Sequence, residues 1–104
     1  MADAQVVVKN NEAANRYEVE LEGQTAVLIY IREGKQIIFL HTGVPPALEG
    51  HGIANKLART ALDDARVDGL VVVPECPFVA SYIQRHQEYL DLVPKGERAR
   101  LLRD

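Results

Sequence analysis

The sequence predicts a mixed α/β fold, in which an antiparallel β-meander leads into a β-α-β unit. The first part of the chain consists of strand-like segments separated by turns of a few residues, which is typical of antiparallel hairpins. The second part has two apolar runs, Ile37–Leu40 and Leu70–Val73, with a helical pattern between them. Because a helix joins these two runs, we expect them to lie parallel in one sheet.

Four segments of the first part have the composition of strands. They are Val6–Asn10, Arg16–Leu21, Ala26–Ile31 and Gln36–Thr42. The second of these alternates polar and apolar residues, so Tyr17, Val19 and Leu21 are expected to face the core. The third is apolar on both faces, as in a central strand. The connections are predicted turns at residues 10–15, 22–23 and 33–34.

A helical pattern runs from about Gly52 to about Arg66, and a second helix is expected to begin at Pro77. Proline is favoured at the first helical position, and Gly69 suits the left-handed cap that ends many helices. The apolar stripe of the first helix consists of Ile53, Leu57, Ala61, Leu62 and Ala65. The stripe of the second helix consists of Val79, Tyr82, Ile83 and His86.

Two interpretations are open for each segment at the end of the chain. Residues 89–93 would form either a last strand or an irregular packed segment. The charged tail, residues 94–104, would either fray or form a terminal helix. A chain of 104 residues is long enough for one domain, so we expect a single domain over residues 1–104 with its core at about 6–93.

The composition argues against several classes of protein. A net charge of -3 offers no basic surface for nucleic acid, and no apolar run approaches the roughly 20 residues that span a membrane. Residues 1–5 lack the basic and apolar regions of a signal peptide, and one cysteine cannot form an internal disulfide. We therefore expect a cytoplasmic protein, a monomer or a weak homodimer. Because the histidines and the cysteine lack metal-ligand spacing, we expect no zinc site.

A glycine-containing turn, Glu49–Ala54, lies between the first apolar run and the first helix. Gly50 and Gly52 allow the backbone to turn tightly and to approach a ligand closely. The first amides of a helix have no partner within it and lie at the positive end of its dipole. This segment is therefore a predicted anion site, and phosphate is the usual anion at such a site.

The sequence Glu49-Gly50-His51-Gly52-Ile53-Ala54 resembles the acetyl-CoA pyrophosphate loop of the GCN5-related N-acetyltransferases, whose pattern is Q/R-x-x-G-x-G/A. The order of strand, loop, helix and strand is also similar, over about residues 6–93. The further marks of a minimal, single-domain subgroup are present as His41-Thr42, Pro74 with Cys76, and Arg85-His86. The chain departs from the pattern at Glu49, because a carboxylate beside a pyrophosphate is repulsive unless it points into solvent.

The resemblance implies acetyl-CoA as co-substrate, two main helices, and a splayed pair of parallel strands that holds the pantetheine. Full-size members have one or two helices between their first two strands, whereas this chain has only a turn at residues 10–15. The resemblance therefore implies that the acceptor side of the site is open. An open acceptor side favours an amine on a macromolecule as the acceptor. The implied CoA-binding residues are Thr42, Gly43, Val44, Glu49, Gly50, His51, Gly52, Ile53, Ala54 and Asn55.

Three side chains are candidates for the chemistry. Cys76 would be either a solvent-reachable thiol beside the CoA sulfur, favoured as a thiolate by the following helix, or a small buried hydrophobe. His41 would accept the proton of the amine, or would hold a strand end through a hydrogen bond. Tyr82 would give a proton to the departing CoA thiolate, as the wider family suggests, or would pack in the core. A fourth side chain, Arg85, would reach a CoA phosphate or point into solvent.

Three functions remain open on this basis. The leading interpretation is an acetyl-CoA-dependent N-acetyltransferase that acts on an amine, with an amine on a protein as one acceptor. The alternative is a non-catalytic acyl-CoA-binding or interaction module on the same fold, and the third is a structural domain with an unused loop. For a catalyst, direct attack of the amine on the thioester is the habit of the family and is favoured over transfer through acetyl-Cys76.

Overall fold

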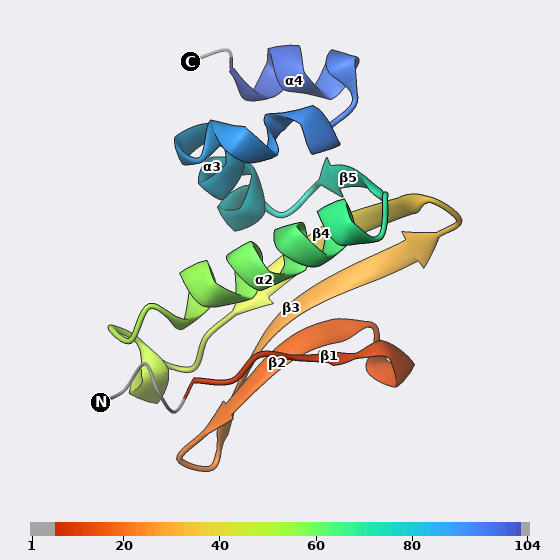
Figure 1. Cartoon of the computed structure of the whole chain (residues 1–104). Helices are drawn as coiled ribbons and strands as arrows, with labels where there is room; N and C mark the ends of the chain where they lie inside the picture. Colours follow the sequence, from red (N-terminus) through yellow and green to blue (C-terminus); the bar gives the residue numbers. More distant parts are fainter. Residues whose placement is uncertain (1–5, 103–104) are drawn as a thin grey trace.

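The computed structural model describes residues 6–102 and has one mixed sheet with helices packed on it (Figure 1). The strands follow one another across the sheet in chain order: β1 (Lys9–Asn11), β2 (Arg16–Leu21), β3 (Gln24–Glu33), β4 (Gln36–Gly43) and β5 (Val71–Pro74). The α-helices are α2 (Ile53–Val67), α3 (Pro77–Arg85) and α4 (Lys95–Leu101). Short 3-10 helices are η1 (Glu12–Ala14), η2 (Pro46–Leu48) and η3 (Gln87–Leu92). The predicted mixed α/β fold is confirmed.

The antiparallel meander runs from β1 to β4, as the short predicted turns require. Glu22 and Gly23 join β2 to β3, and their φ angles of 53° and 75° are those of a tight two-residue hairpin. The segment before β1 differs from the prediction, because the ladder covers only Lys9–Asn11 and not the predicted Val6–Asn10. Val6 is nevertheless buried, so its apolar side chain packs in the core without a strand partner.

The ladder between β3 and β4 contains a bulge in the middle of β4. Ile29 of β3 pairs with His41 of β4, and the next residue of β3, Tyr30, pairs with Phe39. Leu40, which lies between His41 and Phe39, has no partner on β3 and is therefore an extra residue on β4. An extra residue of this kind bends a strand and increases its local twist.

The parallel pair formed by β4 and β5 opens at the same place. Its pairing ends where Phe39 faces Pro74, and the amide of Cys76 then donates a hydrogen bond to the carbonyl oxygen of Phe39 over 2.7 Å. Beyond this point β4 continues to Gly43, and its edge toward β5 has no strand partner among the residues that the structure describes. The two strands therefore form the open end of a V.

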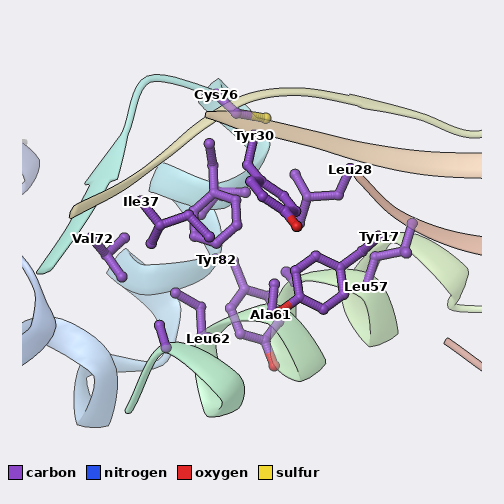
Figure 2. Close-up of a cluster of buried hydrophobic side chains, with 14 of the residues drawn as sticks. Tyr17, Leu28, Tyr30, Ile37, Leu57, Ala61, Leu62, Val72, Cys76 and Tyr82 are labelled. Carbon is purple, nitrogen blue, oxygen red and sulfur yellow. The ribbon is translucent and has the colours of Figure 1, made fainter. Parts of the chain in front are cut away.

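The helices α2 and α3 cover one face of the sheet, and the core lies between the two layers (Figure 2). All the apolar residues predicted for the first helix are buried there: Ile53, Leu57, Ala61, Leu62 and Ala65. Strand residues meet them from the sheet, among them Tyr17, Leu28 and Val72. The opposite face of the sheet is open, since Ile31, Leu40 and Val71 are 41%, 39% and 41% exposed.

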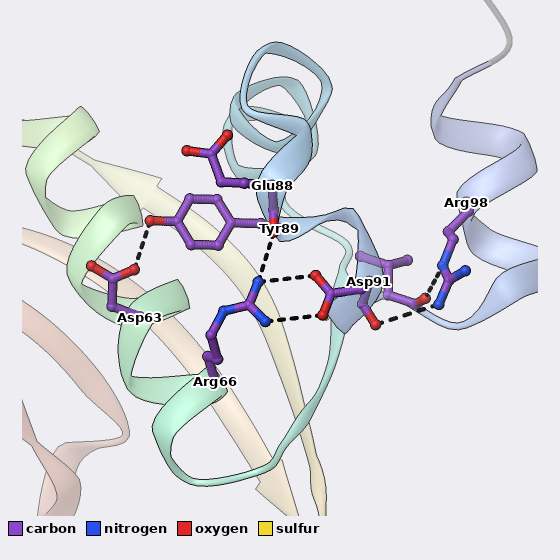
Figure 3. A network of polar contacts seen from close by, with 7 residues as sticks. Asp63, Arg66, Glu88, Tyr89, Asp91 and Arg98 are labelled. Atoms are coloured by element: carbon purple, nitrogen blue, oxygen red, sulfur yellow. Dashed lines mark hydrogen bonds and ion pairs between the residues drawn. The ribbon is translucent and has the colours of Figure 1, made fainter.

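The segment after α3 is a 3-10 helix that packs against α2 (Figure 3). The Tyr89 hydroxyl donates a hydrogen bond to Asp63 over 2.6 Å, and the Arg66 guanidinium holds both oxygens of Asp91 at 2.9 Å. A last strand over residues 89–93 is therefore wrong, and the alternative of an irregular packed segment is confirmed. Contacts with α2, which are distant in sequence, decide its conformation.

The charged tail forms α4 over residues 95–101, which confirms the helical alternative for that part. Residues 103 and 104 lie outside the described residues. Within residues 6–102, no helix combines the length and the apolar character that crossing a membrane requires.

Candidate functional site

The turn between β4 and α2 presents free backbone amides. Gly50 and Gly52 have φ angles of 91° and 69°, which favour glycine because other residues rarely adopt them. Gly52 is the N-cap of α2 and has no side chain to occupy the helix end. The first helical hydrogen bond is from the amide of Lys56 to the carbonyl oxygen of Gly52, at 3.1 Å. The amides before Lys56 are therefore available to an anion, and the first turn contains no acidic residue to compete for them.

A hollow of about 210 Å³ lies beside this turn and is called the loop hollow here. Phe78, from the first turn of α3, also lines this hollow. Most of the predicted CoA-binding residues line it: Val44, Glu49, Gly50, Gly52, Ile53, Ala54 and Asn55. Sequence position alone did not suggest Phe78, because its place opposite the turn depends on how α3 packs.

A second hollow, of about 320 Å³, lies between α2 and α3 and is called the interhelix hollow here. It is lined by His51, Gly52, Asn55, Lys56, Arg59, Tyr82 and His86. Since Gly52 and Asn55 line both hollows, the two adjoin across the start of α2. Sequence reasoning missed Lys56 and Arg59, although their spacing of three residues places them on one helix face.

Thr42 and Cys76 meet at the base of the V. Their side-chain oxygen and sulfur atoms are 3.3 Å apart, and either can be the donor. Cys76 is only 2% exposed, so the expectation of a solvent-reachable thiol is wrong for this structure. The side chain lies at the edge of the core cluster, above Tyr30 in Figure 2, because the residue pairs with β4 before α3 begins.

The His41 side chain lies on the face of the sheet that the helices leave open, opposite the face that α2 and α3 cover. His41 is exposed, and its cross-strand partner Ile29 lies on the same open face. Its Nε2 is 3.3 Å from the position that a Cβ on Gly43 would occupy, so the ring extends along the strand. Since Cys76 is buried in the core on the helix side, the structure does not bring His41 and Cys76 together.

Tyr82 lines the interhelix hollow rather than the V. Its ring stacks on His86 with a centroid distance of 4.1 Å and lies 6.5 Å from the ring of Phe78. Burial raises the pKa of Tyr82 above its usual range, against the opposing effect of the Arg59 charge. The carbon of the Arg85 guanidinium is 6.0 Å from the centre of the Tyr82 ring, and Arg85 lines neither hollow.

The described part of the chain contains no group of three His, Cys, Asp or Glu side chains arranged to hold a metal ion. The features that converge are thus a helix start with free amides, two adjoining hollows and the open edge of β4.

Comparison with known proteins agrees with this arrangement. Residues 16–92 match the family model described as GCN5-related N-acetyl-transferase. Among curated relatives, Protein NATD1 of Gallus gallus is 34% identical over 91 residues, covering 83% of this chain and 83% of the relative. Protein NATD1 of Mus musculus is 35% identical over 89 residues, covering 81% of each.

A solved structure shows the same fold. The solution structure of a GCN5-like protein from Staphylococcus aureus superposes with a TM-score of 0.68 at 24% identity, covering 88% of this chain and 90% of that protein. The fold thus agrees with the family match, which covers both the glycine turn and the V. The chain belongs to the GCN5-related N-acetyltransferase family.

Proposed function

We propose that this protein transfers the acetyl group of acetyl-CoA to an amine, and that the acceptor is an amine on a protein. Membership of the family supports acetyl transfer at a general level. The observation that carries the proposal for this chain is the start of α2, where free amides border the loop hollow next to the open edge of β4.

The proposed binding mode follows from these free groups. The pyrophosphate of CoA lies on the amides of residues 50–55, where the helix dipole favours negative charge. The pantetheine extends along β4 near Thr42, Gly43 and Val44 and forms backbone hydrogen bonds at the unpaired edge. This places the thioester in the V, close to the pair formed by Thr42 and Cys76.

The proposed reaction is a direct attack of the neutral amine on the thioester carbonyl. A C–N bond forms, the C–S bond breaks, and the CoA thiolate leaves and takes up a proton. His41, or a water molecule beside it, accepts the proton of the amine, because the open sheet face on which His41 lies would admit an amine on a protein. Holding the two reactants together can contribute on the order of 7–11 kcal/mol.

A non-catalytic CoA-binding module remains the second candidate. One observation favours it: Cys76, His41 and Tyr82 lie in the core, on the open sheet face and in the interhelix hollow, respectively. These three side chains therefore do not form a preassembled catalytic group.

Turnover separates the two candidates. Acetyl-CoA is incubated with the protein and a panel of amines, lysine-containing peptides and basic proteins, and released CoA thiol and acetylated product are measured. We expect release that depends on the acceptor and that falls when His41→Ala is introduced. Saturable CoA binding without acetylation of any acceptor would favour the binding module, and a failure of CoA to bind would exclude both.

A further inference from the structure

We propose that a second copy of this chain covers the open face of the sheet, so that the protein forms a two-fold dimer with its sheets packed face to face. The contact lies on the half of the face nearest the hairpin between β3 and β4. It leaves His41, farther along β4, at its rim. The inference goes beyond the proposed function and does not depend on it.

The open face is polar on β2 but aliphatic on the next three strands. On β2 the face carries Arg16, Glu18 and Glu20, which alternate with residues buried under the helices. This alternation is typical of a strand whose outer face meets water. The other strands place aliphatic side chains on the same face, and these form the aliphatic patch: Ile29, Ile31, Ile38, Leu40, Val71 and Val73.

The strand register makes the aliphatic patch continuous. Ile31 lies directly across from Ile38, and Ile38 lies directly across from Val73. Residues paired in this way point to the same face, so the three form one row across three strands. Ile31 and Val71 are each 41% exposed. A continuous exposed apolar surface of this kind marks an interaction site.

The edges of the sheet are less suitable for a partner than its face. The edge strands are β1 and β5, which have only three and four residues. Pro74 of β5 has no amide to donate to another strand. Short edge strands and an edge proline hinder the addition of a strand from another chain. A partner is therefore expected on the aliphatic patch.

The charges around the aliphatic patch favour a second copy as that partner. On the β2 side, the Arg16 guanidinium pairs with Glu18 over 2.8 Å. At the hairpin, Glu33 and Lys35 line one hollow of about 380 Å³, together with Val71 of the patch. In a two-fold contact the same surface meets itself, and a rim of one sign would repel its own copy. Because both sides of the patch carry both signs, the rim is compatible with self-association.

The size of the molecule also fits a dimer contact. Its Cα trace extends over 40 × 31 × 19 Å, and Figure 1 shows the strands spread along the broad side. This broad side has an area on the order of 1,000 Å², whereas a standard interface buries about 800 Å² on each partner. Apolar sheet faces pack about 10 Å apart, and α2 and α3 would then form the outer layers of the dimer.

Sedimentation velocity at concentrations from about 1 to about 500 µM tests the association. The proteins are the wild type, the double variant Ile31→Thr with Val71→Thr, and the control Val67→Thr. Threonine is also β-branched and keeps strand propensity, but it presents a hydroxyl to the contact. Val67 is 85% exposed at the end of α2, away from the open face. Circular dichroism confirms that each variant is folded.

We expect the wild type to dimerise with a dissociation constant on the order of 10 µM, as a modest apolar contact would give. The double variant should dimerise at least about tenfold more weakly, because two-fold symmetry makes each substitution count twice. Val67→Thr should dimerise like the wild type.

Methyl NMR of the wild type locates the contact without any substitution. Ile31 and Ile38 belong to the aliphatic patch, whereas Ile53 and Ile83 are buried in the core on the helix side. On dilution through the dimer transition, the methyl signals of Ile31 and Ile38 should shift. Those of Ile53 and Ile83 should stay in place.

A wild type that stays monomeric over the whole range would overturn the inference and leave the proposed function standing, since turnover is measured separately. A dimer that persists unchanged in the double variant, or that shifts only Ile53 and Ile83, would also overturn it, because the contact would then lie elsewhere. If the protein stays monomeric and a synthetic amphipathic peptide of leucine and lysine shifts Ile31 and Ile38, a different protein partner covers the face.

Discussion

At the scale of single residues, the burial of Cys76 bears on the mechanism. Its sulfur lies 3.3 Å from the Thr42 hydroxyl, and the residue is 2% exposed. A thiol in this position closes the base of the V and is shielded from bulk solvent. This favours the interpretation in which Cys76 lines the thioester site and does not carry the acetyl group.

Substitution of Cys76 tests this interpretation. Cys76→Ala and Cys76→Ser should keep much of the turnover, with a stability loss of about 1 kcal/mol for the alanine variant. The wild type incubated with acetyl-CoA alone should gain no acetyl mass, and its thiol should react slowly with thiol reagents until urea is added. Loss of nearly all turnover in both folded variants, together with an acetyl adduct on the wild type, would establish the covalent route instead.

Glu49 is the residue at which the chain departs from the family pattern, and it lines the loop hollow. Because its carboxylate would repel a nearby pyrophosphate, Glu49→Gln should strengthen CoA binding about two- to threefold at low salt. The gain should shrink as salt rises from about 0.02 M to about 0.5 M, since screening weakens the repulsion. Glu33→Gln, at the distant hairpin, is the control. An affinity that does not change at any salt concentration would mean that the carboxylate points away from the ligand.

At the scale of secondary-structure elements, tyrosines join α2 to its neighbours. The Tyr17 hydroxyl on β2 donates to Asp64 over 2.8 Å, and the Tyr89 hydroxyl on η3 donates to Asp63 over 2.6 Å. Burial, followed by the hydrogen bond to the carboxylate, raises the pKa of both tyrosines well above the usual range. The neutral phenol is therefore favoured in the folded state.

This predicts a loss of stability in alkali. A group whose pKa is raised by folding stabilises fully below its unfolded pKa, which is about 10 for tyrosine, and the contribution is lost as the pH rises toward the folded pKa. Urea unfolding from about pH 8 to about pH 11 should show this decline, and Tyr17→Phe should make it shallower. A decline of the same slope in Tyr17→Phe would show that other groups control it.

The elements that local sequence determines were predicted closely. The alternation of Arg16–Leu21 gave the bounds of β2, and the stripe beginning at Ile53 gave α2 to within one residue at each end. The sequence could not decide between the two interpretations of residues 89–93, because Tyr89 and Asp91 of η3 contact Asp63 and Arg66, which are far away in sequence. The bulge at Leu40 escaped prediction for a similar reason, since it appears only in the pairing with β3.

At the scale of the whole molecule, the arrangement of the layers defines where ligands can approach. The helices α2 and α3 cover one face of the sheet, and the other face is open. The glycine turn was predictable because its function depends on local backbone geometry at Gly50 and Gly52. The interhelix hollow was not, since it exists only where α2 packs beside α3. For the same reason, the sequence could not show that Cys76 and His41 lie on different faces.

The placement of CoA at the start of α2 can be tested with two matched glycines. Gly52 and Gly69 flank the two ends of α2 with φ angles of 69° and 68°, and a Cβ on either would meet nothing within 4 Å. Gly52→Ala and Gly69→Ala should therefore each lose about 1 kcal/mol of stability through the same backbone strain. The methyl group at position 52, however, would lie where the pyrophosphate approaches the backbone.

Calorimetric titration of CoA into the two folded variants and the wild type gives the decisive comparison. We predict that Gly52→Ala binds CoA about tenfold more weakly or worse, as the loss of contacts to a charged group would give. Gly69→Ala should bind CoA like the wild type. Equal affinity in all three proteins would contradict the placement of the pyrophosphate on the start of α2.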